Sequence, residues 1–249
     1  MSALLKSAGF IGLYFAFGLL AGMVSSGGDS VHVTLLADVC MILAGTLYLS
    51  RGTLRTDREF RARRRSSGRA GPFRVLSGCA AFLSIWLLVQ ITATYLSALV
   101  PDVRFGAYQS AFSGADPTEA LVLAVLAAPA AEEVLMRGVV QTLLRGRFGP
   151  VPAVLVSGCV FAVLHGTVTH LYTGAVLGIC FGITYERTRS LPVCVFAHAA
   201  CNAAAVAVAA AGIVFRMSAA VAVLVVILNV WMAFLLASGV RGTEADHGC

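Results

Sequence analysis

The chain has 249 residues, of which 59% are hydrophobic and only 12% are charged. Soluble domains carry roughly 25% charged residues, so the composition excludes an ordinary soluble domain. The formal net charge of +6 is concentrated in one stretch and leaves long uncharged runs of Ala, Val, Leu and Ile elsewhere. Helices satisfy their own backbone hydrogen bonds in lipid, so these runs predict an all-α, polytopic transmembrane helix bundle.

About eight spans are expected, each separated from the next by a polar or glycine-rich segment. The first could pass for a signal peptide, but another apolar segment follows within ten residues, which favours an uncleaved helix. In chain order the predicted spans are 8–24, 32–49, 75–100, 118–144, 153–165, 171–185, 193–211 and 218–237.

Nine arginines lie between residues 51 and 74, opposed only by Asp57 and Glu59. Such a run could bind nucleic acid, but between two spans it is typical of a cytoplasmic loop that contacts anionic membrane lipids. We therefore expect no nucleic-acid partner. The other basic residues near span ends mostly fall on the same face: Lys6, Arg145, Arg147, Arg187, Arg189 and Arg241. The bias predicts cytoplasmic termini, and the composition is typical of a bacterial cell membrane protein.

No internal repeat and no soluble domain is visible, so the chain is interpreted as one integrated bundle. Residues 1–110 would supply N-terminal helices around the basic loop 51–74. Residues 111–217 would form the functional core, and 218–249 a final span with a polar tail. The sequence does not indicate an oligomeric state.

Three polar clusters interrupt the apolar spans: Glu132 and Glu133 with Arg137, His165 four residues after Phe161, and His198 four residues before Asn202. Charged groups at bilayer depth cost about 2.5–3.5 kcal/mol each on insertion scales, which makes them functional candidates.

Glu133 and Arg137 are one helical turn apart and are predicted to pair. Glu132 is rotated by about 100° and has no local partner, so it could act as a general base. In a purely structural interpretation, Arg137 neutralises one glutamate, and the histidines and Asn202 only pack or bond between helices.

In order and spacing, the three clusters resemble the motifs of the CAAX protease and bacteriocin-processing family (Abi or CPBP), the group of the Ras-converting prenyl endopeptidase. The resemblance covers about residues 118–211. It implies an intramembrane glutamate-type endopeptidase without a cofactor. In such an enzyme Glu132 and His165 would activate water, and His198 and Asn202 would form the oxyanion hole. Glu133 and Arg137 would orient the site, beside Phe161. Its substrate would be a membrane-associated peptide or protein tail.

Three alternatives stay open from the sequence. His165, His198 and a glutamate could bind zinc in a metalloprotease, although no His-Glu-x-x-His spacing is present. A non-catalytic immunity or partner-binding protein could use the same fold. A transporter could relay protons through the buried Glu and His residues, although paired repeat halves are not visible.

The predicted depths of the histidines conflict. In straight spans that begin at the membrane surface, His165 would lie about 20 Å into the fifth helix and His198 only about 8 Å into the seventh. We therefore expect the two side chains to meet only if the fifth helix begins below the membrane surface or is strongly tilted.

Overall fold

The computed structural model describes residues 3–24, 30–50, 72–99, 116–165 and 168–212, together with isolated positions at 218, 220, 223, 224 and 227. The predicted eighth span lies almost wholly outside the described residues, as do residues 51–71 of the arginine-rich loop. The remaining seven predicted spans can each be compared with a helix.

The described segments are helical and contain no strand, which confirms the all-α class. Their helices are α1 (Ala3–Val24), α2 (Ser30–Ser50), α4 (Pro72–Leu99), α9 (Pro150–Leu164), α10 (Val168–Thr188), α11 (Leu191–Ala210) and one long helix over Pro117–Phe148. We call the last one the central helix. It consists of α6 (Pro117–Val122), the π-helical segment η1 (Leu123–Ala127), α7 (Ala128–Glu133), the π-helical segment η2 (Val134–Gln141) and α8 (Thr142–Phe148).

Two helical stretches are long and apolar enough to cross a membrane by length and composition, His32–Ser50 and Leu191–Ala210. Shorter apolar stretches are Leu4–Phe17, Phe82–Leu96 and Pro150–Leu164. The count of eight spans therefore stays a prediction.

The polarity of the bundle suits a lipid environment. Leu47, Leu83 and Phe196 are large apolar side chains that are 66%, 63% and 76% exposed. Glu133 and Arg137, by contrast, are fully buried. Water would make this distribution costly, whereas a bilayer favours apolar groups outside and paired polar groups inside.

Local sequence signals set the ends of the central helix. Asp116 accepts hydrogen bonds from the backbone N–H groups of Thr118 and Glu119, at 2.8 and 3.3 Å, and Pro117 occupies the first helical position. These donors hold the pKa of the Asp116 carboxyl below its ordinary value. At the other end Gly149 has a φ of 82°, which a residue with a side chain rarely adopts. The chain therefore turns sharply there into α9.

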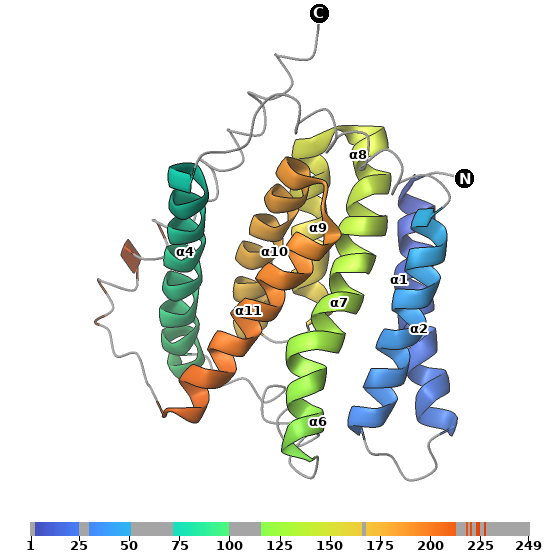
Figure 1. Ribbon diagram of the computed structural model, residues 1–249, viewed down its shortest axis with the longest axis horizontal. Coiled ribbons are helices and arrows are strands. Elements are labelled where there is room, and N and C mark those ends of the chain that lie inside the picture. The colour runs from blue at the N-terminus through green and yellow to red at the C-terminus, as the bar shows by residue number, and fades with distance from the viewer. Residues whose placement is uncertain are drawn as a thin grey trace, which may run out of the picture.

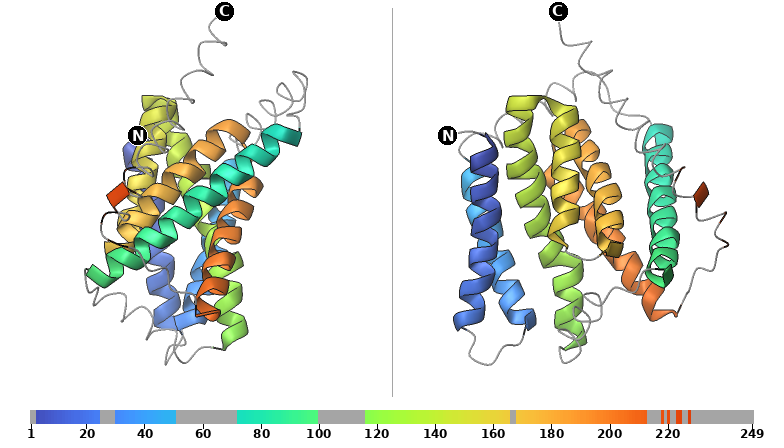
Figure 2. Two further views of the ribbon diagram at one scale, coloured as in Figure 1. Left: turned by 90° about the vertical axis from the view of Figure 1, so that its left-hand side faces the viewer. Right: turned by 180° about the vertical axis from the view of Figure 1, so that it is seen from behind.

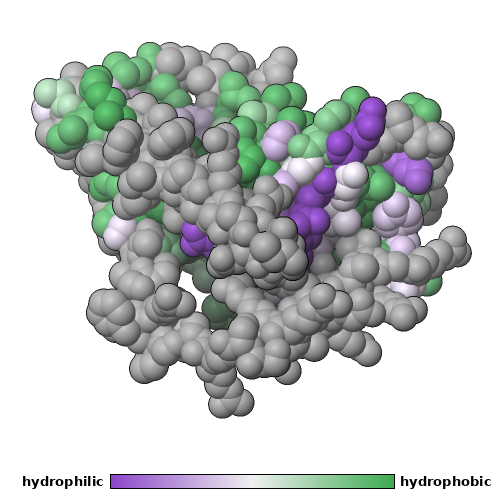
Figure 3. Space-filling view, turned by 90° about the horizontal axis from the view of Figure 1, so that it is seen from above, coloured by the Kyte–Doolittle hydropathy of each residue, from purple (hydrophilic) through white to green (hydrophobic). Residues whose placement is uncertain are grey.

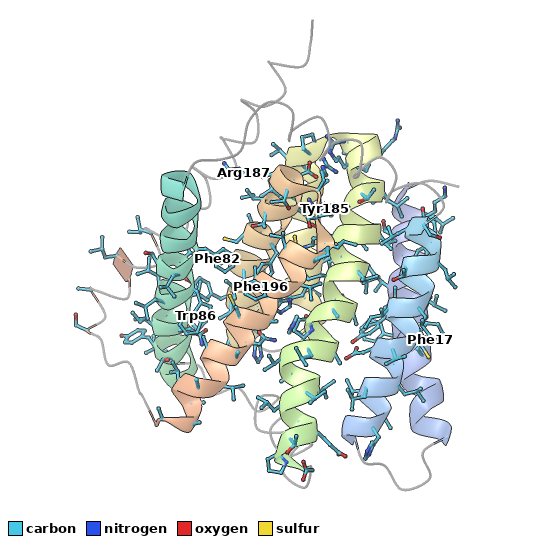
Figure 4. All side chains as sticks on the ribbon, in the orientation of Figure 1. Phe17, Phe82, Trp86, Tyr185, Arg187 and Phe196 are labelled. Atoms are coloured by element: carbon cyan, nitrogen blue, oxygen red, sulfur yellow. The ribbon has the colours of Figure 1, made fainter. Side chains whose placement is uncertain are left out.

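The central helix divides the bundle. The α1–α2 hairpin lies on one side of it and α9, α10 and α11 lie on the other, with α4 outermost (Figures 1 and 2). Phe82 and Trp86 of α4 point toward α10 and α11 and pack with Phe181 and Cys201 (Figure 4).

One end of the bundle is polar. Arg187 lies at this end, where α8 also finishes with exposed Arg145 and Arg147 (Figure 4). Seen from this end, hydrophilic side chains gather between hydrophobic ones on the flanks (Figure 3). The clustering is consistent with the predicted cytoplasmic face.

Helices α9 and α10 pack closely through glycine. A Cβ added to Gly178 would lie 3.1 Å from the Cα of Gly158, and one added to Gly174 would lie 3.0 Å from the Cα of Ala162. Small residues allow such close approach between membrane helices. This contact fixes the position of α10 next to Arg137 of the first polar cluster.

Candidate active site

The paired glutamates lie in a short α-helical turn between two π-helical segments. In η1 the backbone N–H of Ala128 donates to the carbonyl of Leu123, five residues earlier. In η2 the hydroxyl of Thr142 donates to the carbonyl of Arg137, also five residues earlier, at 3.0 Å. π-Helical turns are rare and occur frequently at functional sites. Each one changes the direction in which the following side chains point.

Glu133 and Arg137 form the buried charged centre of the bundle. Nε of Arg137 lies 3.1 Å from Oε2 of Glu133, close enough for an ion pair although the two atoms are not aligned as a hydrogen bond. Nη2 of Arg137 donates to the carbonyl of Gly178 at 3.0 Å. The guanidinium also lies 5.0 Å from the ring of Phe161 and 5.4 Å from that of Phe181. The pairing predicted from the spacing is confirmed, and α9 and α10 hold the arginine in place.

The imidazole of His198 lies between the two glutamates. Its Nδ1 is 3.0 Å from Oε1 of Glu133, and because the carboxylate accepts, Nδ1 carries the proton. Its Nε2 is 3.7 Å from Oε2 of Glu132, beyond hydrogen-bond distance. The ring stacks on Phe181 with centroids 4.7 Å apart. The contacts orient Nε2 toward the more exposed of the two carboxyl groups.

His165 caps the end of α9 and points one nitrogen back at its own helix. Its Nδ1 donates to the carbonyl of Phe161 at 2.8 Å. In a neutral ring this leaves Nε2 as an acceptor, the state that a general base or a water-orienting group needs. The ring of Phe161 contacts both histidines, at 4.6 Å from His165 and 5.7 Å from His198.

A cavity of about 1050 Å³ opens beside these groups. Glu132, His165 and His170 line it, together with Tyr14 of α1. The rest of the wall is largely apolar and includes Phe15, Leu121, Leu135, Leu164 and Val206. The cavity therefore combines an ionisable carboxyl and an imidazole with a surface that accepts an apolar chain.

The depth conflict is resolved by α11. This helix begins deeper in the bundle than the upper end of α10 and runs obliquely across it (Figure 1). The connection before it turns inward, since Arg189 is buried and has a φ of 48°. His198 consequently reaches the glutamates, and the expected tilt or deeper start of the fifth helix stays a prediction.

Asn202 is directed elsewhere. Its side-chain N–H donates to the carbonyl of Ala124 in η1 at 2.8 Å, and the residue does not line the cavity. The structure thus brings together Glu132, Glu133, Arg137, Phe161, His165 and His198, while it connects Asn202 to the backbone of the central helix.

Sequence reasoning missed Asp38 and Tyr14. Asp38 of α2 is fully buried, and Oδ1 accepts a hydrogen bond from the Tyr14 hydroxyl at 3.0 Å. Its other oxygen has no hydrogen-bond partner among the described residues. Asp38 also lies within electrostatic reach of Glu132. The signal was available, because a carboxyl in the apolar run 32–49 is as unusual as the glutamates in theirs.

A second polar network was also missed. Glu186 of α10 accepts hydrogen bonds from Gln141 at 3.1 Å and from Arg145 at 2.9 Å, and it pairs with Arg189. Ser157 of α9 donates to Gln141 at 3.3 Å. The network joins the upper part of the central helix to α9 and α10 and lies outside the cavity wall.

Within the described residues, no group of three or more His, Cys, Asp or Glu side chains is arranged to hold a metal ion. His165 uses one nitrogen on a backbone carbonyl, and His198 uses one on Glu133.

Residues 115–204 match a family model described as type II CAAX prenyl endopeptidase Rce1-like. The matched segment contains all three motifs and covers just over a third of the chain. No curated protein and no solved structure matches the chain.

Proposed function

We propose that the protein is a membrane-embedded endopeptidase, because residues 115–204 match the type II CAAX prenyl endopeptidase Rce1-like family model. Its substrate is a membrane-associated peptide or protein tail, reached from the cytoplasmic side. The supporting observation is that Glu132 and His165 line one cavity, with His198 3.7 Å from Glu132.

In the first step, water in the cavity donates hydrogen bonds to the Glu132 carboxylate and to Nε2 of His165. Glu132 takes a proton as the water oxygen bonds to the scissile carbonyl carbon. His165 needs no rearrangement for this role, because its bond to the Phe161 carbonyl already makes Nε2 the acceptor.

In the second step, the developing oxyanion accepts a hydrogen bond from Nε2–H of His198. Glu133 holds the His198 ring through Nδ1–H, and Arg137 balances the charge of Glu133. The C–N bond then breaks, and the proton held by Glu132 passes to the leaving amine. One water is consumed for each peptide bond that is cleaved.

The apolar wall of the cavity supports a lipidated tail as the first substrate to test. We would reconstitute the purified protein in liposomes with a fluorogenic peptide ending in a prenylated C-a-a-X sequence, beside the same peptide without the prenyl group. We expect wild-type cleavage, and a loss of about 10²–10⁴-fold in Glu132→Gln, which keeps the shape of the side chain but not the base.

Glu119→Gln is the matched control, because Glu119 lies on the same helix but pairs with His32 at 3.4 Å, outside the site. Unchanged cleavage by Glu132→Gln would remove Glu132 from the mechanism. Loss of cleavage with a chelator would favour the zinc enzyme. Binding without cleavage by wild type would favour the partner-binding protein, and proton flux across the liposomes would favour the transporter.

A further inference from the structure

The carbonyl of Ala124 lacks the partner that the helix would normally give it. In η1 the N–H of Ala128 donates to Leu123, five residues back. The next donor in this register would be the N–H of residue 129, and it would reach Ala124. Residue 129 is proline and has no N–H. Ala124 is partly buried and lies in the cavity wall, so its carbonyl depends on a donor from another helix or on water in the cavity.

Asn202 supplies the missing donor from another helix. Its Nδ2 lies 2.8 Å from the Ala124 oxygen, the geometry of a full hydrogen bond. The contact joins residues 78 positions apart in the chain. It therefore satisfies a partly buried backbone carbonyl that the central helix does not satisfy in this register.

The same contact fixes the distance between the two helices that carry the catalytic groups. Helix α11 is attached to the central helix at two points: His198 contacts the glutamates and Asn202 contacts Ala124, one helical turn further along α11. Asn202 carries one further amide N–H, so this attachment is compatible with a second bond to substrate.

We propose that Asn202 is a positioning residue that donates to the Ala124 carbonyl the hydrogen bond that Pro129 cannot, and so holds the turn of the central helix that carries Glu132. The expected effect of this hydrogen bond on catalysis rests on the proposed function, whereas the hydrogen bond itself does not depend on it.

A double-mutant cycle between Asn202→Ala and Pro129→Ala tests this inference. Alanine at position 129 restores a backbone N–H, which completes the helix at Ala124 in the π register. If the segment returns to an α-helix, Ala128 reaches Ala124 instead. We expect Asn202→Ala to lower the unfolding temperature in detergent by about 2–4 °C when it is made in the wild-type protein. When it is made in Pro129→Ala, the same substitution should lower the unfolding temperature much less.

The kinetic cycle gives the readout that a merely structural contact would not change. We expect Asn202→Ala to lower kcat on the prenylated peptide by about 10–10²-fold with little change in KM, because Glu132 is misplaced. When Asn202→Ala is made in Pro129→Ala, the logarithm of its fold-loss in kcat should be at most half of the value in the wild-type background.

Pro192→Ala combined with Asn202→Ala is the matched control. Pro192 is exposed in the first turn of α11 and lacks a contact of this kind, so it should rescue neither quantity. Additive unfolding temperatures in the Pro129 cycle would overturn the proposed hydrogen bond. Rescue of the unfolding temperature without rescue of kcat would overturn the positioning role and leave Asn202 as an oxyanion donor.

The two proposals fail separately. The thermal cycle needs no substrate, so it decides on the hydrogen bond even if no peptide is cleaved. Absence of wild-type cleavage counts against the proposed function only.

Discussion

At the scale of single residues, the site depends on how each buried charge is balanced. Glu133 accepts from His198 and pairs with Arg137, so one carboxylate contacts both side chains. Glu132 has only the more distant His198 contact and a side chain that is 23% exposed. The spacing of the motif predicted the pair between Glu133 and Arg137, because the two residues are one helical turn apart. It could not predict the contact with His198, which lies on another helix.

The ion pair leads to a prediction about stability. Arg137→Met should lower the free energy of unfolding by about 3–5 kcal/mol, because it leaves Glu133 buried without its main counter-charge. Adding Glu133→Gln should recover at least half of that loss, since the amide needs no counter-ion and still accepts from His198. Thermal unfolding in detergent measures both. The exposed Arg147→Met serves as the control, and a double variant less stable than Arg137→Met would contradict the explanation.

Asp38 and Tyr14 lead to a second residue-level prediction, with opposite outcomes for the two partners. Tyr14→Phe removes a hydrogen-bond donor to the buried Asp38 carboxyl and should destabilise the protein by about 1–3 kcal/mol. Asp38→Asn keeps the acceptor for Tyr14 and replaces the oxygen that has no partner among the described residues by an uncharged amide group, so a buried ionisable group is lost. It should therefore be neutral or stabilising in the same unfolding assay. A larger loss for Asp38→Asn would show that the carboxyl itself is required.

At the scale of helices, the glycines between α9 and α10 determine where Arg137 can be held. Gly178→Val should separate the two helices, because its Cβ would meet Gly158 at 3.1 Å. The carbonyl of residue 178 would then move away from Arg137. We expect loss of at least 2 kcal/mol of stability and loss of cleavage, both measured on purified protein.

Gly146→Ala is the matched glycine control, because nothing lies within 4 Å of an added Cβ there. This change should be tolerated or slightly stabilising. Equal damage from both substitutions would indicate that backbone conformation, not helix contact, limits position 178.

The positions of the helices in the sequence were largely predictable, whereas the irregular turns within and between them were not. Seven apolar runs identified seven helices because length and hydrophobicity are properties of each segment. The two π-helical segments escaped prediction, since only Pro129 hints at the first and no local signal marks the second. The inward turn before α11 depends on burial of Arg189, which is a tertiary contact. The distance between His165 and His198 could therefore not be derived from the sequence.

At the scale of the whole molecule, the charge pattern makes a prediction about orientation. Arg147 and Thr118 lie near opposite ends of the central helix. The positive-inside rule places Arg147 in the cytoplasm. In intact cells an impermeant maleimide should label Thr118→Cys, and it should label Arg147→Cys only after the membrane is permeabilised. Wild type measures the background from native cysteines, and the reverse pattern would invert the orientation.

The π-helical segment η1 has a consequence for how sequences of this kind can vary in length. A π turn contains one more residue than an α turn, so a chain that lacks one of the five residues of Leu123–Ala127 can still form a continuous helix. The helix before the deletion would then keep nearly its orientation relative to Glu132, because an α turn closes with one residue fewer than a π turn. Such a deletion would preserve hydrophobicity and all three motifs, and yet it would remove the register in which the Ala124 carbonyl is left to Asn202. Within this segment, the number of residues is therefore as much a part of the site as their identity.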